Sequence, residues 1–139
     1  MRYLLDTHAA VWLLSADQER LPEHIRNSIL YCEDTFAMSE ISIVEIIQLQ
    51  QRKRIELRYR PNTIRTIIEE NNIEIIPLSD DILERFFDLP MPTINGSLHG
   101  DPFDRLIIAT ALRRGLTLVS SDSKFPWYQA NCGLHLLAI

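Results

Sequence analysis

The sequence is poor in cysteine: Cys32 and Cys132 are the only two among 139 residues, and they lie far apart. No C-x-x-C pair is present, which argues against a zinc site and against a disulfide framework. We therefore expect both thiols to be reduced and to be buried or half-buried.

Long hydrophobic runs are also missing. The opening segment 1–8 begins apolar, but Asp6 and His8 interrupt it before it reaches the length of a signal-peptide core. No stretch approaches the roughly 18 apolar residues that indicate a membrane span. The sequence therefore predicts a cytoplasmic protein without membrane contact.

The chain lacks an excess of positive charge. Its 14 Lys and Arg face 19 Asp and Glu, so the formal net charge is -5, whereas proteins usually bind nucleic-acid phosphates with a surplus of cations. Five of the acids recur where apolar runs stop: Asp6, Glu45, Asp101, Asp104 and Asp122. If these five are left out, 14 acidic residues face 14 Lys and Arg. The pattern predicts a neutral body with a local acidic hole, which a divalent cation would largely cancel.

Several catalytic signatures are absent. The sequence contains neither G-x-x-x-x-G-K-[ST] nor G-x-G-x-x-G, so neither common phosphate-binding loop is indicated. No serine lies in a G-x-S-x-G elbow, which argues against an α/β hydrolase. The four histidines show no H-x-x-x-H spacing.

What the chain does contain is an alternation of short β-branched or aromatic runs with longer stretches of helical period. This alternation is typical of a parallel sheet with helices on both faces, and 139 residues suit one domain. We expect strands near 2–5, 35–38, 73–76, 117–119 and 134–138. We expect helices near 8–15, 22–31, 42–53, 61–71, 80–88, 103–114 and 123–129.

Local signals mark several helix ends. Pro22 and Pro61 suit a first helical turn, and Gly115 suits a C-terminal cap after two arginines. The spacing Ser42-Ile43-Val44-Glu45 predicts a capping box, and Asp101-Pro102-Phe103-Asp104 predicts a capped helix start. The stretch 89–100 is the one loop long enough for a lid or a binding loop.

The five acids admit two interpretations. Each one alone could be a helix cap, since a negative side chain is favoured at a helix N-terminus. Together, at one edge of one sheet, they would repel each other unless a cation lay between them. Magnesium suits a few carboxylates that leave room for water and phosphate oxygens, and it activates water for phosphodiester hydrolysis.

Other residues indicate contacts less specifically. The segment 51–60 holds five cations and one aromatic residue, and either a solvated helix end or contact with RNA phosphates or an acidic partner explains it. Trp12, Trp127 and Tyr128 are more typical of a core or a dimer interface than of base stacking. His99, close to Asp101, is either a loop histidine or a group that touches a phosphate.

The chain resembles the PIN domain family, and within it the VapC-type toxins of bacterial toxin-antitoxin pairs. The resemblance rests on Leu4-Leu5-Asp6-Thr7-His8, on Ser42-Ile43-Val44-Glu45-Ile46, on the block 99–111 (HGDPFDRLIIATA) and on Ser120-Ser121-Asp122-Ser123-Lys124-Phe125. It covers nearly the whole chain in the family's order, and the DPFDR block is its most specific part. It implies a three-layer α/β/α sandwich around a mostly parallel sheet of about five strands.

The resemblance also implies function. It implies a Mg²⁺- or Mn²⁺-dependent endoribonuclease, a cognate antitoxin that blocks it, and a homodimer formed through apolar helix surfaces. Asp6, Glu45, Asp104 and Asp122 fall on the family's acidic quartet, and Asp101 falls on the extra acid of the D-P-F-D variant. The resemblance also gives a supporting role to three small hydroxyl residues, Thr7, Ser42 and Ser121. Candidate contacts with RNA or a partner are Arg52, Lys53, Arg54, His99 and Arg105.

Two other readings stay open. A catalytically inactive PIN-like module would bind or regulate, and its acids would serve as caps. A phosphotransfer domain would use Asp6 as phosphoryl acceptor, but it would be expected to show a D-x-D pair where this chain has His8. Many family members carry an arginine where this chain has Gly100, a difference that concerns the substrate side and leaves the metal ligands unchanged.

Overall fold

The sheet at the centre of the molecule has five strands. The computed structural model describes residues 1–15 and 17–139, and within them the strands run in the order β3-β2-β1-β6-β7 with every neighbouring pair parallel. They span β1 (Arg2–Leu5), β2 (Thr35–Ser39), β3 (Ile73–Ile76), β6 (Thr117–Ser120) and β7 (Leu136–Ala138). All five expected strands are therefore confirmed.

Helices connect these strands close to where the periodicity places them. They are α1 (Thr7–Leu14), α2 (Glu23–Tyr31), α3 (Glu40–Gln51), α4 (Pro61–Glu70), α5 (Asp80–Asp88), α6 (Pro102–Arg114) and α7 (Phe125–Cys132), with a 3-10 turn η1 (Gln18–Arg20) that the sequence reasoning missed. The largest shifts are at α3 and α7, which begin two residues earlier and two residues later than expected.

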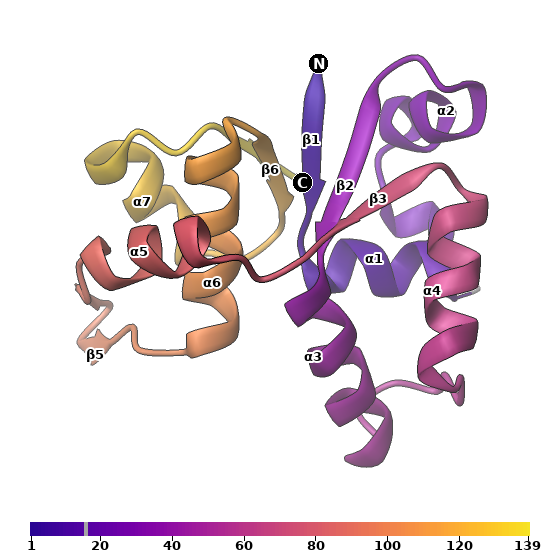
Figure 1. The fold of residues 1–139 in the computed structure, drawn as a ribbon, viewed down its shortest axis with the longest axis horizontal. Helices are drawn as coiled ribbons and strands as arrows, with labels where there is room; N and C mark the ends of the chain where they lie inside the picture. The colour runs from indigo at the N-terminus through magenta and orange to yellow at the C-terminus, as the bar shows by residue number, and fades with distance from the viewer. Residues whose placement is uncertain (16) are drawn as a thin grey trace.

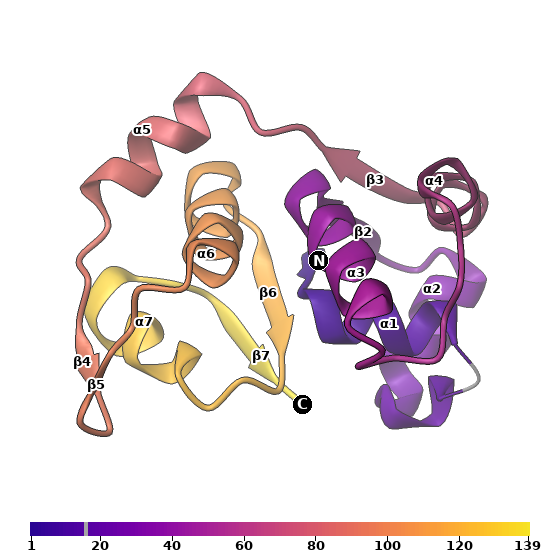
Figure 2. The same cartoon turned by 90° about the horizontal axis from the view of Figure 1, so that it is seen from below.

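The two faces of the sheet carry separate hydrophobic cores. Along β1, Tyr3 and Leu5 join a cluster made with helices α1 to α4, whereas Leu4 joins a cluster made with α5, α6 and α7. Such alternation follows from the two-residue period of a strand. Figures 1 and 2 show the result: α1, α2 and α4 lie on one side of the strands and α5, α6 and α7 on the other. The three-layer arrangement is confirmed.

The order of the strands fixes where a site can form. From β1 the chain turns to β2 on one side, and β6 later pairs with the other side of β1. The carboxyl ends of β1 and β6 therefore flank the point where the connections diverge, which is the usual ligand position in open α/β sheets.

The expected lid loop contains a small hairpin. Strands β4 (Thr93–Ile94) and β5 (Ser97–Leu98) pair antiparallel around Asn95 and Gly96, whose φ angles are 52° and 81°. Asn-Gly favours a two-residue turn of this kind because both positions need positive φ. The segment is thus partly ordered by its own backbone bonds.

Two predicted caps are wrong in position. Helix α3 starts directly at the end of β2, so Ser39 caps it by accepting a bond from the Ile41 amide, and Ser42 lies inside the helix. The capping box of Ser42 and Glu45 therefore does not form. Pro22 is the N-cap of α2 rather than a first-turn residue.

Other caps agree with the sequence. Asp101 caps α6 through the Phe103 and Asp104 amides, and Pro61 opens α4. Gly115 ends α6 in the left-handed region at φ 65°. These features depend on neighbouring residues only, which is why local rules predicted them.

The cysteines correct one expectation. Both are free, but Cys32 is exposed at the left-handed end of α2, while Cys132 is half-buried. Within the described part of the chain, no helix has the length and apolarity needed to cross a membrane.

Candidate functional site

The five acids predicted from the sequence lie around one pocket of about 160 Å³. It opens at the carboxyl ends of β1 and β6, beside the N-termini of α1 and α6. The lining residues are Asp6, Thr7, His8, Glu45, Asp101, Asp104, Ile107 and Asp122. The fold therefore gathers carboxylates that are more than a hundred residues apart in the chain.

Asp6 is fixed by two hydrogen bonds at the end of β1. It caps α1, since its Oδ1 accepts from the Ala9 amide at 2.8 Å, and its Oδ2 accepts from the Ser120 hydroxyl at 2.5 Å. The side chain is 5% exposed, and this burial raises the pKa of Asp6 despite both hydrogen bonds. Its charge is therefore costly without a cation nearby.

Glu45 reaches the pocket from the second turn of α3. Thr7 donates from its hydroxyl to Oε1 of Glu45 at 2.5 Å, and the same hydroxyl lies 3.0 Å from Oγ of the fully buried Ser42. Burial, followed by the charges of Asp104 and Asp101, raises the pKa of Glu45. Thr7 thus contacts Glu45 directly, and Ser42 contacts Thr7.

Asp104 is held from behind by a buried histidine. Its Oδ2 lies 3.1 Å from Nε2 of His99, and Nδ1 of His99 lies 2.6 Å from the phenol oxygen of Tyr128. His99 is 4% exposed and Tyr128 is fully buried. Burial raises the pKa of Tyr128 to about 12, so the phenol keeps its proton. Burial also raises the pKa of Asp104, against the hydrogen bond from His99.

Asp101 and Asp122 complete the set from loop positions. Asp101 accepts the Phe103 and Asp104 amides on Oδ1, at 2.9 and 3.4 Å. Asp122 accepts the Lys124 amide on Oδ1 at 2.8 Å, and the Lys124 ammonium lies 3.2 Å from the same oxygen. Each of these acids therefore caps or orders a local turn and also faces the pocket.

Four of the acids share one arrangement. Each of these acids accepts hydrogen bonds from the described residues on only one of its two carboxylate oxygens. The four are Glu45, Asp101, Asp104 and Asp122. The second oxygen of each has no protein donor there. A helix cap needs only the first oxygen, so the pattern leaves a set of free oxygens around the pocket.

This donor set fits a hard divalent cation. Mg²⁺ and Mn²⁺ prefer carboxylate oxygens and retain several waters, so they need few direct protein ligands. In residues 1–15 and 17–139 no three His, Cys, Asp or Glu side chains stand close enough to form a ready-made ligand group. The pocket therefore offers converging carboxylates with room between them rather than a closed cage.

Other predicted residues have different surroundings. His99 and Arg105 are buried, and Arg105 donates to the Leu89 carbonyl and lies 4.7 Å from the centroid of the Phe86 ring. Arg52, Lys53 and Arg54 are exposed after α3. The structure thus gives His99 and Arg105 protein partners and leaves the three exposed cations facing solvent.

Two supporting residues escaped the sequence reasoning. Ser120, not its exposed neighbour Ser121, bonds Asp6 and accepts the Asp122 amide at 3.0 Å. The sequence could have indicated Ser120, since it directly follows the expected strand 117–119 and lies two residues before Asp122. Nothing in the sequence indicates Tyr128, because its partner His99 is 29 residues away.

Comparison with known proteins gives a consistent result. A family model described as the PIN domain matches residues 3–130. The chain is 31% identical over 121 residues to Ribonuclease VapC22 of Mycobacterium tuberculosis, and the match covers 87% of each chain.

Solved structures share the fold. A chain of VapBC2 from Rickettsia felis bound to a promoter DNA fragment aligns with a TM-score of 0.67 at 20% identity, over 99% of this chain and 98% of that one. A chain of DNA-bound VapBC from Salmonella typhimurium aligns with a TM-score of 0.66 at 18% identity and the same coverage. FitAcB from Neisseria gonorrhoeae gives 0.60 at 18% identity, over 99% and 96%.

Proposed function

Since this chain belongs to the PIN domain family, we propose that it is a metal-dependent endoribonuclease, the toxin of a type II toxin-antitoxin pair. The observation that carries the proposal is the acidic pocket itself. Five carboxylates converge, and in four of them one oxygen has no protein donor among residues 1–15 and 17–139. Helix capping alone does not require such convergence.

The cation would be held by Asp6, Glu45, Asp104 and Asp122, with Asp101 as a fifth acid at the rim. A bound Mg²⁺ or Mn²⁺ supplies an activated water and neutralises charge as the phosphodiester bond breaks. Burial, with some repulsion between neighbouring acids, makes Asp6, Glu45 and Asp104 costly to ionise, so a cation and these three acids would stabilise each other.

The supporting residues orient these carboxylates. Ser120 and the Ala9 amide fix both oxygens of Asp6, and Thr7 fixes Glu45. His99 occupies one oxygen of Asp104, which turns the other toward the pocket. Such outer hydrogen bonds commonly set the geometry of metal ligands. Ser121 keeps only a proposed supporting role, at the exposed end of the same turn.

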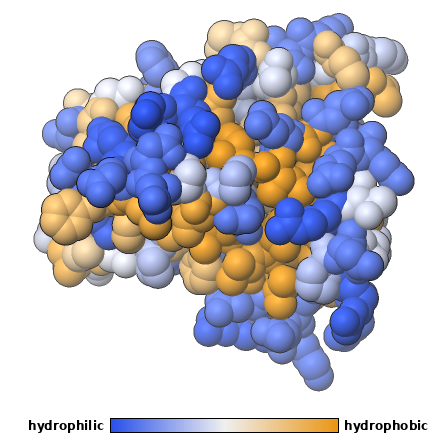
Figure 3. Space-filling view, viewed as in Figure 1, coloured by the Kyte–Doolittle hydropathy of each residue, from blue (hydrophilic) through white to orange (hydrophobic). Residues whose placement is uncertain are grey.

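Partners follow from the relatives. Ribonuclease VapC22 is named as a ribonuclease, and the structural neighbours are toxin-antitoxin complexes, which supports an RNA substrate and an antitoxin partner for this chain. RNA as substrate also supports action in the cytoplasm. We further propose a homodimer through the apolar surfaces of α3 and α5, where Val44, Leu83 and Phe87 are exposed. Figure 3 shows apolar side chains gathered across the middle of the face that carries these helices.

The deciding experiment is cleavage of a mixed RNA pool by the purified chain with Mg²⁺ or Mn²⁺. Chelator, Asp6→Asn and Asp104→Asn should each abolish cleavage. Asp88→Asn makes the same chemical change at an exposed end of α5, and it should cleave like the unchanged chain. Cleavage in excess chelator, or by Asp104→Asn, would remove the metal site from the proposal. No cleavage together with no metal binding would favour the inactive module.

A further inference from the structure

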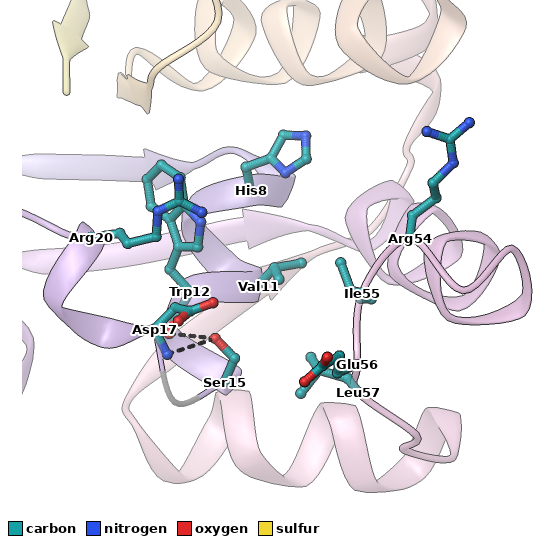
Figure 4. A pocket seen from close by; sticks show the side chains of 10 residues that line it. All are labelled: His8, Val11, Trp12, Ser15, Asp17, Arg20, Arg54, Ile55, Glu56 and Leu57. Carbon is teal, nitrogen blue, oxygen red and sulfur yellow. Dashed lines mark hydrogen bonds between the residues drawn. The ribbon is translucent and has the colours of Figure 1, made fainter.

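A second and larger pocket of about 530 Å³ lies next to the acidic one. It is bounded by one face of α1, by η1 and by the segment 54–57 after α3 (Figure 4). We call it the Trp12 pocket, after the aromatic side chain in its wall. The acid chemistry does not account for it. Val11 belongs to the core that α1 to α4 share, and Trp12, Ile55 and Leu57 pack against that core, yet all four also line the pocket.

One face of α1 joins the two pockets. His8, Val11, Trp12 and Ser15 follow the spacing of a single helical face and all line the Trp12 pocket. His8 also lines the acidic pocket, directly after Asp6 and Thr7. A chain lying in the acidic pocket can therefore continue along α1 past His8 into the Trp12 pocket.

The walls combine a flat aromatic surface with cations. The guanidinium carbon of Arg20 lies 5.3 Å from the centroid of the Trp12 ring, and Arg54 stands on the opposite side of the hollow (Figure 4). Both arginines are exposed, and neither has an ion-pair partner within 4 Å in the part of the chain that the structure describes. Ile55 and Leu57 add an apolar wall.

We propose that the Trp12 pocket binds one nucleotide of single-stranded RNA, next to the phosphodiester bond that the acidic pocket cleaves. The proposal rests on the proposed function and extends it to substrate recognition. The base lies against Trp12 and the guanidinium plane of Arg20, and Arg54 contacts a phosphate. Aromatic and guanidinium planes are the surfaces on which unpaired bases stack.

Charge favours RNA as the occupant. The chain is acidic overall, and the acidic pocket attracts phosphates only through a cation, so binding energy for RNA must come from elsewhere. Arg54 in this pocket is continuous with the exposed Arg52 and Lys53, which places the basic segment beside the site. The acids at the rim, Asp17 and Glu56, can accept hydrogen bonds from exocyclic amino groups of a base.

The size of the pocket favours a single unpaired nucleotide. Its volume falls in the range of small-ligand sites, and one helix, one short turn and one loop enclose it. A duplex buries its bases and could not present one to Trp12. Duplex RNA should therefore compete weakly with single strands.

Trp12 provides a direct readout of occupancy. The chain has two tryptophans, so in a Trp127→Phe background only Trp12 emits. Short single-stranded RNA of random sequence, added with Ca²⁺ in place of Mg²⁺ or Mn²⁺ so that a cation is present while cleavage is slowed, should quench this emission in a saturable way. Duplex RNA of the same length should quench it at least about tenfold less effectively, since stacking of an exposed base carries the binding.

Variants at the pocket test the residues. Arg20→Gln and Arg54→Gln should each weaken RNA binding about fivefold to tenfold. Arg54→Gln, which removes the phosphate contact, should also lower the salt dependence by about one ion. Arg58→Gln removes an exposed cation from the same segment outside the pocket, and its effect should be under about twofold. Trp12→Leu, with its folding checked by thermal unfolding, should weaken binding about tenfold.

The outcomes separate the pocket from the acid chemistry. Metal binding by calorimetry and the quenching of Trp12 are independent. Normal metal binding and cleavage with no quenching would overturn the Trp12 pocket alone, whereas quenching without metal binding would support the pocket and overturn the proposed nuclease. Equal effects of Arg54→Gln and Arg58→Gln would overturn the pocket. The proposal would also be overturned if the Arg20, Arg54 and Trp12 variants bound RNA normally but no longer bound a co-expressed antitoxin, since the pocket would then be a protein-docking surface.

Discussion

Tyr128 and His99 form a buried hydrogen bond of 2.6 Å between the phenol oxygen and Nδ1. The phenol keeps its proton, because burial raises the pKa of Tyr128 to about 12. In a neutral imidazole, the phenol then donates to Nδ1, and Nε2 carries the proton that it donates to Asp104. The pair thus fixes the orientation of one proposed metal ligand from a buried position behind it.

We therefore predict that His99→Ala weakens Mn²⁺ binding about tenfold to a hundredfold, the usual range for residues that orient metal ligands. His99→Gln should restore part of this loss, because its amide can both accept and donate. Calorimetric titration of metal gives the affinities without requiring RNA. A fully retained affinity in His99→Ala, with the fold intact, would show that Asp104 needs no such support.

Tyr128→Phe tests the far end of the same contact. It leaves Nδ1 of a buried imidazole without its donor, and it should lower the free energy of unfolding by about 1 to 2 kcal/mol. Metal affinity should fall less than in His99→Ala. Denaturant unfolding and calorimetry on the double variant would show whether the two changes are coupled, and additive effects would contradict the arrangement.

Crowding of the carboxylates should be visible in stability. The pKa of Glu45 is raised by burial, so ionisation disfavours the folded state as the pH rises above the ordinary value of 4.5. Glu45→Gln should unfold at the same temperature as the unchanged chain below pH 4.5 and at a temperature higher by about 3 °C near pH 7. Glu70→Gln, at the exposed end of α4, is the matched control. A difference that grows toward acid pH would have the wrong sign.

A divalent cation should reverse this cost. In the unchanged chain without RNA, Mn²⁺ at a hundred times its dissociation constant should stabilise the fold by about 2.7 kcal/mol. The stabilisation should shrink strongly in Asp104→Asn. Thermal unfolding with Mn²⁺ or with chelator measures both. An equal gain in the two proteins would place the ion elsewhere.

The proposed dimer can be tested at its most exposed apolar residue. Phe87 on α5 is 84% exposed, and Phe87→Glu should convert a dimer to a monomer by burying a charge in the interface. Leu30→Glu makes a similar change on α2, where Leu30 is 69% exposed, and should leave the dimer intact. Light scattering at micromolar concentration distinguishes these states. A monomer before any substitution would refute the dimer.

Much of this architecture was predictable from short-range patterns. The apolar runs of β1, β2 and β6 gave the strands, and the Asp101 cap could be located because its acceptor and donors are neighbours. The convergence of Asp6, Glu45, Asp104 and Asp122 was also predictable, since parallel strands end at one edge of a sheet.

The features that the sequence did not predict have physical reasons. Ser39 displaces Ser42 as the cap of α3 because the helix begins with no loop after β2, and local propensity does not reveal that tight connection. The Asn95-Gly96 turn was visible in the sequence, but its two strands are too short for an alternation pattern. The bond of Tyr128 to His99 depends on how α7 packs against the segment between β5 and α6, and no local rule gives that.

The bond from Ser120 to Asp6 joins residues that are 114 positions apart. Strand β1 lies more than a hundred residues before its sheet neighbour β6, so β6 leaves the ribosome well after β1. The acidic pocket cannot assemble until β6 and Asp122 have emerged, because contacts between distant segments form only once both are free. The activity proposed for this pocket is therefore withheld from a growing copy of the chain until β6 and the loop that carries Asp122 have been translated.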